Sequence, residues 1–191
     1  MEQQVIWSLN YSTKFPCAKK RQVIFPNRWD QEKRPQDFLE IARRVKELDP
    51  TIEFVVTTSR PTFRSTSPQL EHLAKHAVED GIITVYSGLP KTMYYEIMAQ
   101  SRVMLSTSIE ENWGYCVTEA ATFGTVPICT RGYSYQELLP DEFLFSSIEE
   151  AVVLVMKAVD TKIPHSKLAK IVDYADGTLD RIIKLIKEFE Q

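Results

Sequence analysis

Short apolar runs alternate along the chain with longer segments that have helical spacing. The apolar runs have the length of buried strands, and they lie at residues 23–25, 52–57, 82–86, 102–106, 125–129 and 143–145. The helix signals fall between them, at residues 35–48, 67–81, 91–101, 112–124, 133–139 and 147–156. A last helix is expected from Thr178.

Helix boundaries are marked by turn and capping residues. Pro35 suits a first helical turn, and Asp49-Pro50 stops the same helix. The apolar residues expected on its buried face are Phe38, Ala42, Val45 and Leu48. Ser147 and Glu150 have the spacing of a capping box ahead of an apolar run.

Strands that alternate with helices predict an α/β fold, here a single Rossmann-like, doubly wound parallel sheet of about six strands. We expect a docking or linker segment at residues 1–20, which contains Trp7. A Rossmann-like domain would span residues 21–161, and a helical segment at 162–191 would pack on or beside it.

Composition fits a soluble globular protein, with 43% hydrophobic and 26% charged residues. No apolar run reaches the roughly 20 residues of a membrane span, and the first residues lack a signal-peptide core. The three cysteines Cys17, Cys116 and Cys129 have no metal-like spacing, so a reducing cytoplasm is the simplest setting.

Charge is distributed unevenly along the chain, although the net charge is only −3. Residues 1–34 hold seven Lys/Arg against three Asp/Glu, and residues 110–150 hold one against eight. This net charge excludes the class of strongly basic nucleic-acid-binding proteins. The basic and acidic stretches could be merely complementary, or could assemble a phosphate site beside a hydroxyl-binding site.

The candidate chemistry centres on Glu111 and Glu119, eight positions apart at the start of a predicted helix. Both could be ordinary solvated charges, which a helix dipole favours. Glu119, however, lies in the apolar stretch VTEAATFG, where a buried carboxylate needs a partner. A ligand hydroxyl or a nearby Lys or Arg would serve, and the helix N-terminus at 112–115 favours an anion or polar oxygen.

Other candidates follow the predicted strands, at the sheet edge where ligands of such folds bind. Arg28 follows the first strand, Ser87-Gly88 the third and Glu110-Glu111 the fourth. Arg28 and Lys33 could equally be surface charges that flank a turn. His72 and His76 have metal-binding spacing but no third ligand, so no metal site is predicted. Met93, Tyr94 and Tyr95 favour packing over base stacking.

Together these stretches resemble the C-terminal, donor-binding half of GT-B glycosyltransferases, specifically the retaining family 4 type. Glu111 and Glu119, followed by EAATFGTVPI, match the E-G-F-G-x4-E-A-x-A-x-G-x-P-V signature of that family. Its Arg-x4-Lys corresponds to Arg28 and Lys33, and SGLP resembles its third-strand exit loop. The resemblance covers about residues 20–160. Within it, NRWDQEKRPQDF and GYSYQELLP look like the branch that glycosylates a modified tRNA base.

The resemblance implies a role for each matching residue. Arg28 and Lys33 would hold the diphosphate, and Glu119 would accept the ribose hydroxyls. Glu111 would hold hydroxyls of the transferred sugar, helped by the N–H groups of Asn112, Trp113, Gly114 and Tyr115. Ser87, Gly88 and Leu89 would face the nucleobase. The donor would be a UDP- or GDP-hexose, and no metal or other cofactor is expected.

Two departures from the family stand out. Asn112 replaces the usual Gly after the first Glu, and Asn tolerates a positive φ better than most residues. The acceptor-binding half that precedes the donor half in these enzymes is not in this sequence. One expectation is therefore a donor domain that works with a partner chain, as a homo-oligomer, or as a fragment of a longer enzyme. The other is a non-catalytic module that acts through protein association. A tRNA or DNA base is an alternative acceptor, with Lys19, Lys20, Arg21, Arg60 and Arg64 as phosphate contacts.

Overall fold

The computed structural model describes residues 18–163, 167, 168 and 171. Its elements follow the predicted order closely. They are β1 (Lys20–Phe25), η1 (Gln31–Lys33), α2 (Pro35–Leu48), β2 (Glu53–Thr57), α3 (Pro68–Glu79), β3 (Thr84–Tyr86), α4 (Lys91–Gln100), β4 (Ser101–Ser106), α5 (Tyr115–Thr122), β5 (Val126–Thr130), α6 (Tyr135–Leu138), η2 (Asp141–Phe143), β6 (Leu144–Phe145) and α7 (Ile148–Asp160).

The strands form one sheet in the order β3-β2-β1-β4-β5-β6, and every neighbouring pair is parallel. This confirms the predicted Rossmann-like fold. The chain builds one half of the sheet outward from β1 and the other half outward from β4. The strand order therefore reverses between these two strands, which is where ligands bind in such sheets.

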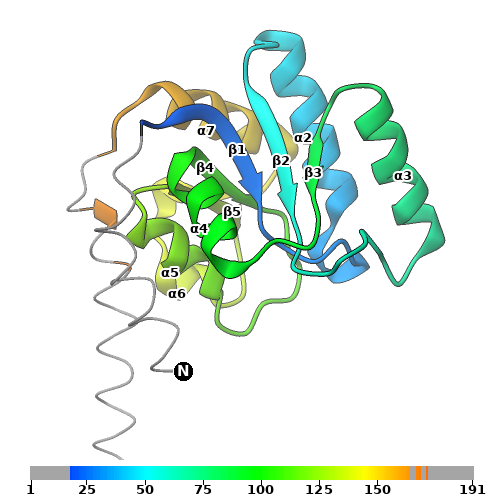
Figure 1. Cartoon of the computed structure of the whole chain (residues 1–191). Helices are drawn as coiled ribbons and strands as arrows, with labels where there is room; N and C mark the ends of the chain where they lie inside the picture. Colours follow the sequence, from blue (N-terminus) through cyan, green and yellow to red (C-terminus); the bar gives the residue numbers. More distant parts are fainter. Residues whose placement is uncertain (1–17, 164–166, 169–170, 172–191) are drawn as a thin grey trace, which may run out of the picture.

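Helices cover both faces of the sheet (Figure 1). α2 and α7 pack against each other on one face, and α4 and α5 lie on the other. The central strands are buried on both sides, as expected for a parallel sheet, and Val23, Ile24 and Leu105 have no exposed surface.

An aromatic cluster fixes the segment that leaves β1. The Trp29 ring makes edge contacts with Phe25 and Phe38, at centroid distances of 5.7 Å and 6.1 Å. Its indole N–H donates to the Leu70 carbonyl oxygen at 2.8 Å. Arg28 and the following loop therefore extend from a rigid support.

Two details of the helices test the sequence patterns. Ser147 caps α7, because its Oγ accepts a hydrogen bond from the Glu150 N–H at 3.2 Å, as predicted. Leu48, however, is 66% exposed, whereas Phe38, Ala42 and Val45 are buried. The prediction for Leu48 was wrong because it is the last residue of α2, where the chain turns away from the core.

Two predicted elements fall outside the described residues: the docking segment around Trp7 and the helix from Thr178. Cys17 lies outside them as well. Most of the segment 162–191 also lies outside them, although Leu168 and Ile171 are described and buried. Within the described ranges, no helix is both long and apolar enough to cross a membrane.

Candidate functional site

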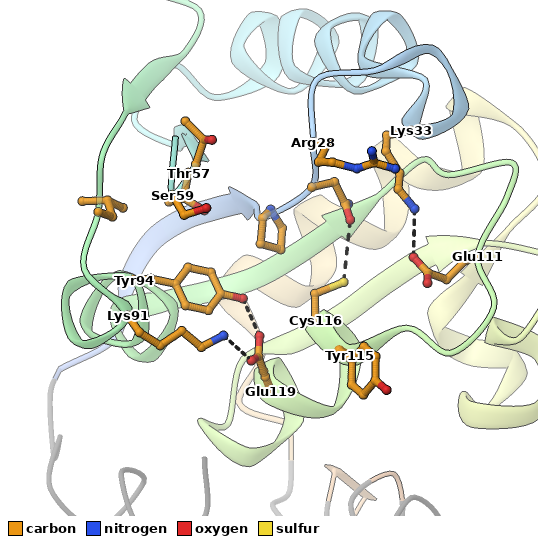
Figure 2. A pocket seen from close by; sticks show the side chains of 14 residues that line it. Arg28, Lys33, Thr57, Ser59, Lys91, Tyr94, Glu111, Tyr115, Cys116 and Glu119 are labelled. Atoms are coloured by element: carbon orange, nitrogen blue, oxygen red, sulfur yellow. Dashed lines mark hydrogen bonds and ion pairs between the residues drawn. The ribbon is translucent and has the colours of Figure 1, made fainter. Parts of the chain in front are cut away.

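A cavity of about 400 Å³ opens at the carboxyl ends of β1, β2 and β4, where the strand order reverses (Figure 2). The residues that line it come from the strand exits, from η1 and from the first turns of α4 and α5. They are Pro26, Asn27, Arg28, Lys33, Thr57, Thr58, Ser59, Leu89, Lys91, Tyr94, Glu111, Tyr115, Cys116 and Glu119.

The basic side of the cavity is held to the exit of β4. The Thr107 hydroxyl is within hydrogen-bond distance of the Lys33 and Arg34 carbonyl oxygens, at 2.8 Å and 2.9 Å. The Ile109 N–H donates to the Glu32 carbonyl oxygen at 2.9 Å. Arg34 adopts a left-handed backbone with φ of 45°, which turns the chain from η1 into α2. These contacts fix the position of Lys33 relative to the loop that carries Glu111.

Arg28 reaches the cavity from the β1 exit and is 62% exposed. Its guanidinium group pairs with Glu32 at 2.6 Å and lies 3.7 Å from Asp30. Asp30 is buried and accepts hydrogen bonds from the Thr66 N–H and hydroxyl at 2.9 Å and 3.1 Å. Burial acts to raise the pKa of Asp30, but these hydrogen bonds and the neighbouring arginines bring it below its ordinary value.

Lys33 and Glu111 form a largely buried ion pair. Lys33 Nζ lies 3.0 Å from Glu111 Oε2, and the two side chains are only 12% and 17% exposed. Glu111 Oε1 also accepts a hydrogen bond from the Gly114 N–H at 3.1 Å, just ahead of α5. Burial acts to raise the pKa of Glu111, but Lys33 and these backbone donors lower it below the ordinary 4.5. Glu111 is therefore an ionised carboxylate at neutral pH, held at the edge of the cavity.

Glu119 is 7% exposed and has three side-chain donors around it. Lys91 Nζ lies 2.7 Å from Oε1, Tyr94 Oη lies 2.7 Å from Oε2, and Tyr95 Oη lies 3.3 Å from Oε1. Burial, followed by the charge of Glu119, raises the pKa of Tyr94 well above its ordinary value. A carboxylate in such apolar surroundings was expected to have a partner. The structure provides one lysine and two tyrosines as the partners of Glu119.

The structure gathers some predicted site residues around the cavity and leaves others outside its lining. Arg28, Lys33, Leu89, Glu111, Tyr115 and Glu119 line it. Ser87, Gly88, Asn112, Trp113 and Gly114 do not. The Gly88 N–H donates to the Arg60 carbonyl oxygen at 2.7 Å, and the Leu89 N–H donates to that of Thr58 at 3.3 Å. Those two donors are therefore already used. The roles assigned to all eleven residues stay predictions.

Several lining residues were not singled out from the sequence. Thr57 ends β2, and Thr58 and Ser59 directly follow it, so the rule that ligands bind beyond strand ends would have found them. The buried Thr57 hydroxyl has no hydrogen-bond partner among the described residues, and Figure 2 shows it beside the cavity. No such rule would have found Lys91, because nothing in the sequence indicates that it pairs with Glu119.

Cys116 and Asn27 also line the cavity and lie close to each other. Cys116 Sγ lies 3.8 Å from Asn27 Oδ1, and Asn27 Nδ2 donates to the Ser106 hydroxyl at 3.1 Å. Burial, with the charges of Glu111 and Glu119, raises the pKa of the Cys116 thiol to about 12. The thiol is therefore protonated at neutral pH and is not a nucleophile.

Two of the proposed nucleic-acid contacts are engaged elsewhere. Lys19 Nζ donates to the Ser101 and Phe123 carbonyl oxygens, both at 2.9 Å, and to the Thr125 hydroxyl at 2.8 Å. Arg21 pairs with Asp49 at 2.7 Å and with Asp160 at 3.0 Å. Both residues lie at the N-terminal end of β1, whereas the cavity lies at the C-terminal end of this strand. The charge count could not show that both side chains have partners within the chain, and their contact with nucleic acid stays a prediction.

The described residues contain no group of three His, Cys, Asp or Glu side chains placed to hold a metal ion. His72 and His76 face each other on the exposed side of α3, with their Nε2 atoms 3.2 Å apart. The positive charge that lines the cavity comes from Arg28, Lys33 and Lys91.

Comparison with known proteins places this geometry in context. The profile of the family "Glycosyl transferases group 1" matches residues 12–165. A tRNA-queuosine alpha-mannosyltransferase of Drosophila melanogaster is 23% identical over 125 residues, which are 65% of this chain and 32% of that protein. The chain thus spans about a third of the length of this curated relative.

Solved structures share the fold at low sequence identity. A mutant of S. aureus TarM in complex with UDP superposes with a TM-score of 0.71 at 14% identity, covering 90% of this chain and 36% of TarM. The pneumococcal O-GlcNAc transferase GtfA, in complex with UDP and GlcNAc, gives 0.68 at 20% identity, with coverage of 93% and 37%. The fold fits the C-terminal half of a GT-B glycosyltransferase. The chain therefore belongs to the glycosyl transferases group 1 family.

Proposed function

We propose that this chain is the donor-binding part of a glycosyltransferase and that it binds a nucleotide-diphospho-sugar in the cavity. One observation carries the proposal: two basic and two acidic side chains from distant parts of the chain line a single cavity at the strand-order reversal. Arg28 and Lys33 lie on one side of it, and Glu111 and Glu119 come from the facing α5 region.

Each residue has a chemical task in this proposal. The guanidinium group of Arg28 and the ammonium group of Lys33 bind the diphosphate and stabilise the charge that develops as the sugar leaves. Glu119 accepts hydrogen bonds from the ribose hydroxyls, since a carboxylate offers two oxygens. Glu111, held ionised by Lys33, accepts from hydroxyls of the sugar. We expect retention of configuration, as in the family 4 enzymes that the sequence resembles, and no bound metal.

Isothermal titration calorimetry with UDP, GDP, UDP-hexoses and GDP-hexoses tests the proposal. We expect saturable binding of one series, and we expect Glu119→Gln and Lys33→Met each to weaken it by at least about tenfold. Arg44→Met is a matched control, because Arg44 pairs with Glu40 and Glu149 away from the cavity. Absence of binding by the folded wild-type protein, or binding unaffected by both cavity variants, contradicts the proposal.

Turnover separates two versions of the function. Slow hydrolysis or transfer of a donor sugar by the chain supports an enzyme. Nucleotide binding without turnover, even with a partner chain or as a homo-oligomer, supports a non-catalytic interaction module. The chain's length relative to its relatives makes a partner or a second half the natural source of an acceptor site.

A nucleic-acid base is a second candidate acceptor, favoured by the name of the Drosophila relative, which acts on tRNA. Arg60 and Arg64 support it, because both are exposed beside the cavity and have no ion-pair partner within 4 Å among the described residues. Salt-sensitive binding of tRNA that is lost in an Arg60→Glu, Arg64→Glu double variant is expected. Unchanged binding in that variant excludes this surface as the contact.

A further inference from the structure

The Glu119 carboxylate is almost saturated with hydrogen bonds inside the protein. Oε1 accepts from Lys91 at 2.7 Å and lies 3.3 Å from the Tyr95 hydroxyl, and Oε2 accepts from Tyr94 at 2.7 Å. A carboxylate has about four lone-pair sites. Three are used, so only about one remains for a ligand.

A nucleotide ribose brings two hydroxyl groups, so it competes with the existing donors. The two tyrosines are packed among other rings: Tyr95 is 1% exposed and packs on Phe123 at a centroid distance of 5.0 Å, and the partly buried Tyr94 packs on Tyr95 at 5.4 Å. Lys91 is different. Its side chain is 52% exposed, and it begins α4 on a flexible four-carbon stem. Lys91 is therefore the donor that a ribose can displace.

A displaced Lys91 ammonium group stays close to any nucleotide in the cavity. It lines the same cavity as Arg28, and its Nζ lies 4.8 Å from the ring centroids of both Tyr94 and Tyr95. Moving it into solvent would break an ion pair to a buried carboxylate without compensation. A ligand phosphate offers a replacement anion, whereas an uncharged nucleoside does not.

We propose that Lys91 is a specificity-determining residue that exchanges Glu119 for a phosphate of the ligand, so that the site selects nucleoside diphosphates over the bare nucleosides. This inference rests on the proposed function, because it takes Glu119 as the ribose-binding group. Lys91 weakens the binding of a nucleoside, because it occupies the Glu119 carboxylate that the ribose would use. It strengthens the binding of a diphosphate, because it adds a positive charge beside the phosphates.

The test is the ratio of the affinities for UDP and uridine, with GDP and guanosine measured in parallel. Calorimetry gives the diphosphate affinity, and competition against the diphosphate gives that of the nucleoside. In Lys91→Met we expect UDP to bind about tenfold more weakly while uridine binds as well as in the wild type or more tightly. The UDP-to-uridine affinity ratio therefore falls by at least about tenfold.

Matched variants separate this exchange from a structural role. Tyr94→Phe removes another Glu119 donor without changing charge, so both affinities change by the same factor and the ratio stays constant. Lys91→Arg keeps the positive charge and retains most of the ratio. Lys91→Gln repeats the neutral substitution if Lys91→Met does not fold, as judged by circular dichroism.

Two negative results have different meanings. If the wild-type protein binds UDP or GDP in a Glu119-dependent way but the neutral Lys91 variants change both affinities equally, the inference on Lys91 is overturned and the proposed function stands. If the folded wild-type protein binds neither diphosphate, the proposed function and the inference are overturned together.

Discussion

Lys33 Nζ lies 3.0 Å from Glu111 Oε2, although the two residues are 78 positions apart in the chain. The contact spans the boundary between the two halves of the sheet, because Lys33 follows β1 and Glu111 follows β4. One ion pair therefore ties together the basic and acidic sides of the candidate site.

The Lys33–Glu111 pair should contribute measurably to stability. We expect Lys33→Met to lower the free energy of unfolding by about 2 kcal/mol, because it leaves a largely buried carboxylate without its counterion. Urea unfolding of Lys33→Met, Glu111→Gln and the double variant measures the coupling. Additive effects of the two substitutions would show that the pair is not formed in solution.

The same carboxylate should make stability depend on pH. The pKa of Glu111 is lower in the folded protein than its ordinary 4.5, so the unfolded chain binds the proton more readily. The stabilisation is therefore present above about pH 4.5 and is lost as the pH falls through the folded-state pKa. The difference in unfolding free energy between wild type and Glu111→Gln should shrink from pH 7 to pH 3.5. In the Lys33→Met background the difference should not shrink in this way.

Gly114 should tolerate a side chain less well than Gly124. It has φ of +75°, and a Cβ there would lie 3.2 Å from Tyr135 Cε1 and 3.3 Å from Leu138 Cδ1. Gly124 is a matched control, with φ of +67° and nothing within 4 Å of such a Cβ. We expect Gly124→Ala to cost about 1 kcal/mol and Gly114→Ala about 1–2 kcal/mol more, by urea unfolding. Equal costs would mean that the neighbouring side chains of Gly114 move aside freely.

Lys19 should act as a structural residue and not as a nucleic-acid contact. Its ammonium group donates to two backbone carbonyl oxygens and one hydroxyl between α4, β4 and α5. We expect Lys19→Met to lower the unfolding midpoint in urea, with a loss of about 2 kcal/mol. Lys20→Met, the exposed neighbour, should change stability by less than about 0.5 kcal/mol. A Lys19→Met variant of wild-type stability would restore Lys19 as a candidate surface contact.

The fold was accessible from the sequence because its signals are local. Pro35, Gly81 and Gly124 mark helix ends, and short apolar runs between helices specify buried strands of a parallel sheet. The site was accessible in part, because parallel strands place the residues after them at one edge. Arg28 and Glu111 could be grouped on that basis, whereas Lys33 and Glu119 joined them through the resemblance to the motifs of the family.

Other features depend on contacts that the sequence does not encode locally. Lys91 is 28 positions from Glu119, and only the packing of α4 beside α5 makes them partners. Lys19 and the exposed Lys20 look alike in the sequence, as adjacent lysines of the basic stretch. Only the structure shows that Lys19 has hydrogen-bond partners, which lie more than 80 positions away. Leu48 fits the helical period of α2 yet lies at its exposed end, because periodicity does not show where the core stops.

The neighbouring positions of β1 and β4 have a consequence for the order of assembly. A nascent or truncated chain that ends before β4 contains Arg28 and Lys33 but neither acidic group, whatever local structure it has formed. The nucleotide affinity that we propose for the cavity should thus arise only when both central strands are in place. Nucleotide binding would then report that the middle of the sheet has closed.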